Sequence, residues 1–201
     1  GHNGIILDMA ANKLMDAAFV DGLEAQIAGS AVIMTVLEIP SVAAVRAMEL
    51  GRKHGVRTIL NPAPATHLPS SALANVDYLT PNETELRILM GLPPDDPTPS
   101  ATLARDLHSR GVRNLIVTMG AEGCLLLNED GLRTVPGVAV DVVDTTGAGD
   151  LFAAGFLAGQ AAGRSVADSL TMGAICAAEV ISHYGPRPEA DLSALVSARL
   201  G

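Results

Sequence analysis

The sequence predicts an α/β fold in which helices cover a mostly parallel central sheet. The spacing of apolar residues changes repeatedly between strand type and helix type, and the connections between these segments are short, as in βαβ units. Hydrophobic residues make up 48% of the chain but aromatic residues only 2%, so small aliphatic side chains must build the core, which suits helices on a parallel sheet. A chain of 201 residues can bury one sizeable core, so we expect one domain over residues 1–201.

The first half of the chain contains both kinds of element in alternation. The continuous apolar run at 31–36 predicts a buried strand. Residues 41–54 predict a helix, because Val42, Val45 and Met48 recur at helical spacing. The same reasoning predicts further strands at 5–7, 56–60 and 76–79 and a helix at 83–90.

The second half continues the alternation after a proline-rich loop at 92–100. The Asp130-Gly131 turn between two apolar runs predicts a hairpin. We expect strands at 114–118, 123–128, 132–135 and 138–143, and helices at 101–110, 149–162, 166–182 and 189–199.

Composition argues against nucleic-acid and membrane partners. The net charge is -9 and Lys and Arg do not cluster, so nucleic acid would be repelled. No apolar run approaches the roughly 18 residues of a membrane span, and we expect no signal peptide. Cys124 and Cys176 lie in apolar runs without a CxxC partner, which predicts buried free thiols in a reducing cytoplasm. The expected partner is a small molecule, in the cytoplasm.

The segment from Asp144 to Asp150 carries the strongest chemical signal. A predicted strand ends, Gly147-Ala148-Gly149 turns the chain, and a helix begins with Asp150 in its first turn. Free N–H groups at a helix N-terminus, flanked by glycines, form an anion site. A helix cap alone would explain the glycines, but it would need at most one of the two flanking carboxylates.

Two familiar phosphate-binding motifs are excluded. A Walker A loop requires a lysine in GxxxxGK[ST], and the lysines of this sequence are Lys13 and Lys53. A dinucleotide fingerprint requires a third glycine where Phe152 stands.

The segment 144–152, followed by Gly155-Phe156, resembles the C-terminal signature of the ribokinase (PfkB) family of carbohydrate kinases. Further segments resemble family motifs in the same order: NPAPA at 61–65, NxxE within 80–85 and T-x-G-x-x-G within 117–123. The resemblance covers essentially the whole chain but only the later part of a usual member. It implies a three-layer ribokinase-like fold truncated at the N-terminus, without the family's opening sugar-binding and lid region.

The resemblance implies that Asp150 is the general base for the attacking hydroxyl, close to the transferred phosphoryl group and to the sugar. Gly147, Ala148 and Gly149 would form the anion hole. The alternative for Asp150 is a first-turn carboxylate favoured by the helix dipole.

Asn82 and Glu85 would hold Mg²⁺, largely through water, together with the nucleotide phosphates of ATP. The alternative is a capping box, because the two residues have the required spacing.

By the same resemblance Thr118, Gly120 and Gly123 would line the nucleotide site, although an ordinary strand–turn–strand would look similar. Glu38 follows a predicted strand and would contact the sugar, although strand-end glutamates are usually only solvated.

Asp144 and Thr146 resemble the family's site for a monovalent cation such as K⁺. Its other oxygens would come from the loop after the penultimate helix, at Val180, His183, Gly185 and Glu189. Glu189 stands where many ribokinases have Ser, which departs from the pattern.

The function implied is ATP-dependent phosphorylation of a primary hydroxyl of a sugar, with ribose converted to ribose 5-phosphate. Another sugar or nucleoside kinase of the family is an alternative, and so is a non-catalytic sensor of nucleotide or sugar phosphate. Retention of Asp150, Asn82 and Glu85 argues against the sensor. Family members often pair through the lid, so a homodimer is one possible assembly.

Overall fold

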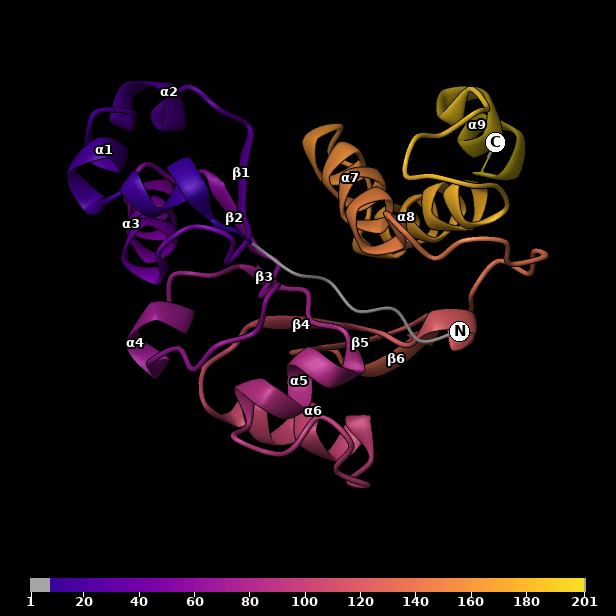
Figure 1. Ribbon diagram of the computed structural model, residues 1–201, viewed down its shortest axis with the longest axis horizontal. Coiled ribbons are helices and arrows are strands. Elements are labelled where there is room, and N and C mark those ends of the chain that lie inside the picture. The colour runs from indigo at the N-terminus through magenta and orange to yellow at the C-terminus, as the bar shows by residue number, and fades with distance from the viewer. Residues whose placement is uncertain (1–7, 201) are drawn as a thin grey trace.

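A six-stranded sheet runs through the centre of the computed structural model, which describes residues 8–200 (Figure 1). In order across the sheet the strands are β1 (Val32–Thr35), β2 (Arg57–Leu60), β3 (Tyr78–Leu79), β4 (Asn114–Thr118), β5 (Cys124–Asn128) and β6 (Gly131–Val135). Neighbours from β1 to β4 pair in parallel, and β4, β5 and β6 pair antiparallel. The expected mostly parallel α/β sheet is confirmed.

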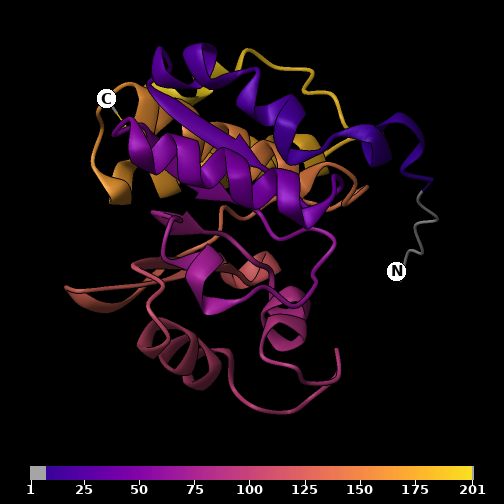
Figure 2. The ribbon, with the colours of Figure 1, turned by 90° about the vertical axis from the view of Figure 1, so that its left-hand side faces the viewer.

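Helices cover both faces of this sheet. One face carries α3 (Ser41–Lys53), α5 (Glu83–Leu89) and α6 (Ser100–Ser109), and the other carries α7 (Ala148–Ala161) and α8 (Val166–Ile181) (Figure 1). Successive strand residues point to opposite faces, so Leu115 packs with the first group of helices and Ile116 with the second. Figure 2 shows α3 in front of the strands and the orange helices behind them. The three layers expected from the sequence are present.

Short helices complete the described chain: η1 (Ala10–Leu14), α1 (Ala17–Asp21), α2 (Glu24–Ala28), α4 (Ser70–Leu73), η2 (Gly120–Glu122) and α9 (Leu192–Leu200). No helix is predicted from the sequence for residues 13–30, where α1 and α2 form. Asp16 caps α1 by accepting a hydrogen bond from Phe19 N (2.8 Å), and buried Val20 joins the core beneath α3. The strand expected at 5–7 lies outside the described residues.

The predicted strand at 138–143 is wrong. The chain leaves the sheet after β6, and the N–H groups of Val143 and Asp144 donate to Ile181 O at the end of α8 (2.8 and 3.3 Å). Val138 packs against the apolar residues between α8 and α9. Val142 and Val143 are exposed. The apolar run therefore does not mark a sheet strand, and of these residues Val138 packs on the helices.

The last helix begins at Leu192, not at residue 189 as predicted. The Asp191 carboxylate accepts hydrogen bonds from the N–H groups of Ser193 (2.9 Å) and Ala194 (3.2 Å), which caps the helix at its actual start. Residues 182–191 remain a loop, and this loop contacts the predicted site.

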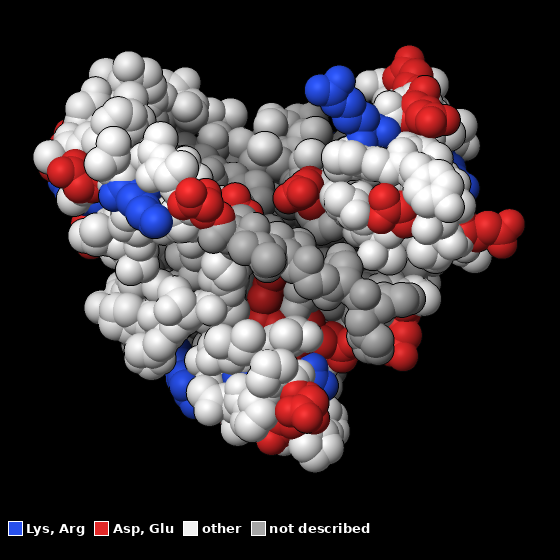
Figure 3. All heavy atoms as spheres, viewed as in Figure 1, with Lys and Arg blue, Asp and Glu red and all other residues white. Residues whose placement is uncertain are grey.

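The surface fits the acidic composition. On the face shown in Figure 3, Asp and Glu are spread widely and Lys and Arg form separate small groups, so the described part of this face has no continuous basic area. Across residues 8–200, none of the helices has the length and apolar character needed to cross a bilayer.

Candidate active site

Segments that resemble family motifs meet at the carboxyl edge of the parallel strands. Hydrogen bonds join them there: Asn61 N donates to Thr35 O (3.0 Å), and Thr118 N donates to Pro81 O (3.0 Å). Glu38 follows β1 and is exposed. In open α/β sheets this edge is where ligands bind.

Helix α7 brings the glycine turn to the same edge. Its last residues lie at the opposite, amino edge, because Arg57 at the start of β2 donates from Nη1 to Gln160 O (3.0 Å). Phe152 and Phe156 of α7 pack on the sheet, and the Phe156 ring meets Tyr78 edge to face at 5.1 Å. At 1.5 Å per residue the helix extends roughly 20 Å. Asp150 therefore lies toward the carboxyl ends of the strands.

The turn at the start of α7 leaves backbone donors free. Gly147 is the N-cap residue, has φ +83°, and supplies no side-chain cap. Within residues 8–200 the N–H groups of Gly149 and Asp150 donate no hydrogen bond. A Cβ atom added at Gly149 would have no neighbour within 4 Å. An anion can approach these two N–H groups without obstruction.

Asp150 is exposed and occupies the third position of α7. Among the described residues its carboxylate accepts no hydrogen bond and forms no ion pair. Cavities of about 450 and 490 Å³ lie elsewhere, one at the amino edge of the sheet and one between α8 and α9, and neither includes Asp150. In this chain the turn is thus an open surface, with the carboxylate available to a hydroxyl group.

Asn82 and Glu85 form a complete capping box at the start of α5. The Asn82 side chain accepts from Glu85 N (2.8 Å), and Glu85 Oε2 accepts from Asn82 N (2.8 Å). Burial raises the pKa of Glu85, and the hydrogen bond from Asn82 N partly offsets this rise. The cap uses only Oε2, so Glu85 Oε1 has no hydrogen-bond partner within residues 8–200 and can still accept from a hydrated cation.

Thr118 and Asn82 are neighbours, since they form an isolated parallel bridge beside the sheet. Gly120 starts η2, and Gly123 ends it with φ +89°. A side chain at Gly123 would overlap the backbone at Val135, so glycine is required there by packing. This loop docks on the segment that leads toward the glycine turn.

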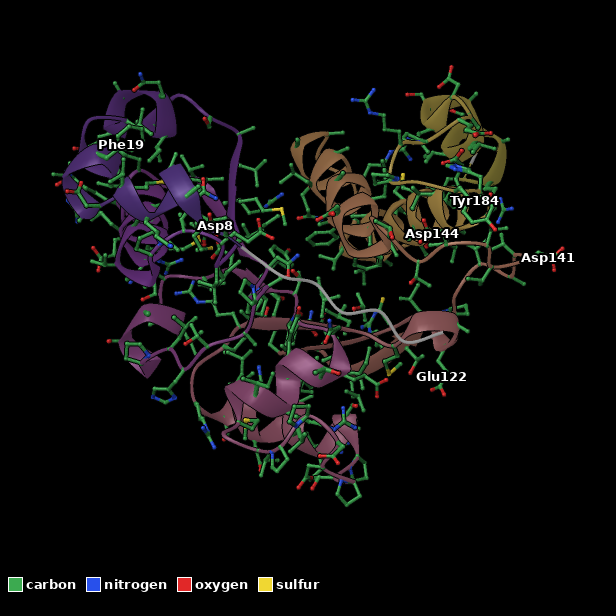
Figure 4. The ribbon with its side chains drawn as sticks, viewed as in Figure 1. Asp8, Phe19, Glu122, Asp141, Asp144 and Tyr184 are labelled. Carbon is green, nitrogen blue, oxygen red and sulfur yellow. The ribbon has the colours of Figure 1, made fainter. Side chains whose placement is uncertain are left out.

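The predicted cation residues fall into two groups. Asp144 Oδ1 accepts from Thr146 N (3.0 Å) and Thr146 Oγ1 (2.7 Å), and Asp144 Oδ2 accepts from Gly185 N (3.2 Å). The bonds from Thr146, followed by the one from Gly185, lower the pKa of Asp144. Figure 4 shows Asp144 on the segment entering α7, with Tyr184 on the neighbouring loop.

Within residues 8–200, Asp144 forms no hydrogen bond with Val180, His183 or Glu189. Val180 is fully buried. His183 Nε2 and Glu189 N instead form hydrogen bonds with the Glu179 carboxyl group. Glu179 is not among the site residues predicted from the sequence. One signal was available, because a carboxyl residue interrupts the apolar helical stretch 174–181.

Comparisons with known proteins agree with this geometry. The family model described as "pfkB family carbohydrate kinase" matches residues 6–191. The ribokinase of Haemophilus influenzae is 34% identical over 183 residues, which cover 91% of this chain and 60% of that protein. The deoxyribokinase of Salmonella typhi is 39% identical over 151 residues, 75% of this chain and 49% of that protein.

A solved structure of Arabidopsis thaliana ribokinase complexed with ribose and ATP superposes with a TM-score of 0.87 at 28% identity. The match covers 98% of this chain and 65% of that one. The chain therefore spans about half to two thirds of the length of these relatives. The family resemblance expected from the motifs is confirmed, and the chain belongs to the pfkB family of carbohydrate kinases.

Proposed function

We propose that the whole protein transfers the terminal phosphoryl group of ATP to a primary hydroxyl of a sugar, with the 5-hydroxyl of ribose as acceptor. The observation that carries the proposal is the start of α7. There the N–H groups of Gly149 and Asp150, which have no hydrogen-bond partner within residues 8–200, share one turn with the exposed Asp150 carboxylate. A phosphoryl acceptor site needs this combination of anion-binding donors and a nearby base.

In this proposal the Asp150 carboxylate accepts the proton of the attacking hydroxyl. The backbone donors of residues 147–150 stabilise the negative charge on the transferred group. Phosphoryl transfer proceeds through a loose transition state, so positioning and electrostatics account for most of the rate enhancement. Gly147 fixes the direction of the donors, because its φ of +83° is strained for other residues.

The nucleotide side of the site would consist of Thr118, Gly120 and Gly123, with Asn82 beside Thr118. Glu85 would act on Mg²⁺ through water, since its carboxylate keeps one oxygen outside the capping box. Mg²⁺ would supply neutralisation of the phosphate charge. Glu38 would contact the sugar from the end of β1.

K⁺ is proposed beside the anion hole. The lowered pKa of Asp144 keeps its carboxylate ionised. Its Oδ1 already accepts two hydrogen bonds from Thr146, but Oδ2 accepts only from Gly185 N and keeps a lone pair for a cation. Backbone oxygens of Val180, His183 and Gly185 would complete the shell, with Glu189 nearby.

The acceptor can be tested by coupled ADP release from the whole protein with ribose, 2-deoxyribose and adenosine. Ribose is expected to give the highest kcat/KM. Deoxyribose is the second candidate acceptor, because a relative at 39% identity is named a deoxyribokinase. Nucleotide binding without ADP release above background for any sugar or nucleoside would instead identify a sensor.

We also infer that residues 1–201 form one domain of a cytoplasmic enzyme, where ATP is abundant and the free, buried Cys124 and Cys176 would stay reduced. A homodimer is the proposed assembly, to be tested by light scattering on the purified protein.

A further inference from the structure

Glu179 is a carboxyl residue in the last turn of α8, surrounded mostly by apolar side chains. Its side chain is only 8% exposed. Ile175 and Ala178 on the same helix are buried, and Ile175 belongs to the apolar cluster between α8 and α9. The general base, the capping box and the proposed cation residues do not include it.

The Glu179 side chain joins both limbs of the loop at 182–191. Its Oε1 accepts from Glu189 N (2.8 Å) and Ala190 N (2.9 Å), where the loop returns to α9. The same oxygen lies 3.3 Å from His183 Nε2, where the loop departs from α8. One buried atom thereby closes the loop at its base.

The tip of this loop touches the turn that precedes α7. Gly185 N donates to Asp144 Oδ2 (3.2 Å). Pro186 lies so close to Gly147 that a Cβ atom added there would be 3.0 Å from Pro186 Cβ. Residues 144–147 thus pack against the loop that Glu179 holds in place.

The other carboxyl oxygen shows that packing alone does not explain why a glutamate occupies position 179. Oε2 is buried and has no hydrogen-bond partner among the described residues. Arg199 lines the cavity beside Glu179, yet it forms no ion pair with it. Burying an unpaired polar oxygen costs free energy, and an apolar side chain of similar volume would avoid that cost. What the carboxyl group supplies is the acceptor for the two loop N–H groups.

We propose that Glu179 is a positioning residue that fixes the 182–191 loop against the 144–147 turn, and so sets the geometry of the anion hole and the cation site. The effect on loop geometry is independent of catalysis. The effect on cation and nucleotide binding rests on the proposed function.

The test compares Glu179→Met, which keeps the volume but removes the acceptor, with Glu179→Gln, whose amide oxygen can accept the same N–H groups. The control is Glu24→Ala. Glu24 likewise joins two segments, through Lys53 Nζ (2.7 Å) and His54 Nε2 (2.6 Å), but it lies in α2, away from α8 and α9 (Figure 1). Amide hydrogen exchange is followed at Gly185, Glu189 and Ala190, and ATP affinity in the presence of Mg²⁺ is titrated at low and high K⁺.

In Glu179→Met we expect amide exchange at Glu189 and Ala190 to accelerate about tenfold to a hundredfold, with a smaller acceleration at Gly185. ATP affinity at high K⁺ should fall about tenfold, because the distorted turn no longer aligns its donors. Glu179→Gln should resemble the wild type in both measurements, and Glu24→Ala should leave both unchanged.

Three results would overturn the proposal. One is fast exchange at Glu189 and Ala190 in the wild type, which is decisive even if Glu179→Met does not fold. Another is unchanged exchange in Glu179→Met, and the third is a Glu179→Gln variant that behaves like Glu179→Met. If the loop loosens in Glu179→Met while wild-type protein binds no ATP, the kinase proposal fails and the positioning role stands.

Discussion

Helices α5 and α7 both begin at the carboxyl edge of the sheet, but the first backbone N–H groups are capped by side chains in α5 and left uncapped in α7. At α5, Asn82 and Glu85 satisfy each other's backbone N–H groups through the capping box. At α7, Gly147 offers no side-chain cap, and the N–H groups of Gly149 and Asp150 have no partner within residues 8–200.

The difference separates a structural N-terminus from one available to a ligand. A helix start costs stability when its donors stay unpaired, and most helices pair them with side chains. Helix α5 follows that rule, so Asn82 and Glu85 have a structural role whether or not they also bind Mg²⁺. Helix α7 departs from it at the position where an anion is expected. The predictions below test this contrast, from the largest effect to the smallest.

Asp150→Asn should lower sugar-dependent ADP release by about a factor of 10² to 10⁴, because the amide cannot accept the proton of the hydroxyl. ATP affinity and the unfolding midpoint should stay near the wild-type values, since the exposed carboxylate makes no hydrogen bond or ion pair within residues 8–200. Steady-state kinetics with calorimetric ATP titration measures both. Wild-type turnover in this variant would rule out the assignment of Asp150 as base.

Gly149→Ala and Gly147→Ala form a matched pair on the same turn. At Gly149 a Cβ atom meets nothing within 4 Å, so stability should be unchanged or rise by up to about 1 kcal/mol. Catalysis should nevertheless fall about a hundredfold, because the methyl group displaces the phosphoryl group from the N–H donors.

Gly147→Ala should instead lose about 1–2 kcal/mol of unfolding free energy, because φ of +83° is strained for alanine. Denaturant titration separates the two variants. An active Gly149→Ala enzyme would show that no anion approaches this turn.

Glu85→Gln tests whether Glu85 acts on Mg²⁺ in addition to capping α5. Glutamine preserves the capping box, so unfolding free energy should change by less than about 0.5 kcal/mol, while Glu85→Ala should lose about 1 kcal/mol. If Glu85 acts on Mg²⁺, the glutamine variant should need about tenfold more Mg²⁺ for half-maximal ATP binding. An unchanged Mg²⁺ requirement would leave Glu85 with a capping role alone.

The two helix starts should also respond oppositely to pH. Burial raises the pKa of Glu85 above its ordinary 4.5, so the folded state holds that proton more tightly, and stability falls as pH rises through the folded pKa. Hydrogen bonds lower the pKa of Asp144 below its ordinary 3.8, so its contribution is present above pH 3.8 and is lost on further acidification. Unfolding free energies should be measured from pH 3 to 7. Glu85→Gln should lack the fall in stability with rising pH, and Asp144→Asn should lack the loss of stability on acidification. Parallel profiles for wild type and both variants would contradict the assigned shifts.

Local sequence determined much of this protein. Apolar periodicity located most of the strands and long helices, because burial on one face imposes a period of 2 or 3.6. The spacing of Asn82 and Glu85 indicated the capping box as the alternative to Mg²⁺ binding, and the Gly147–Asp150 segment predicted a helix start with exposed N–H groups and a carboxylate. All of these depend on residues within a few positions of one another.

The contacts of other residues, such as 138–143 and Glu179, were decided only by the tertiary structure. The stretch 138–143 has the apolar pattern of a strand, but Val138 packs against the cluster between α8 and α9, Val142 and Val143 are exposed, and Val143 N donates to Ile181 O. In sequence, Glu179 is a carboxyl residue in an apolar helix with no evident role. In the structure it accepts hydrogen bonds from the N–H groups of Glu189 and Ala190, ten and eleven positions away. Whether an apolar run pairs in a sheet or packs on a helix, and whether a buried carboxyl group finds donors, depends on neighbours distant in sequence, which periodicity does not encode.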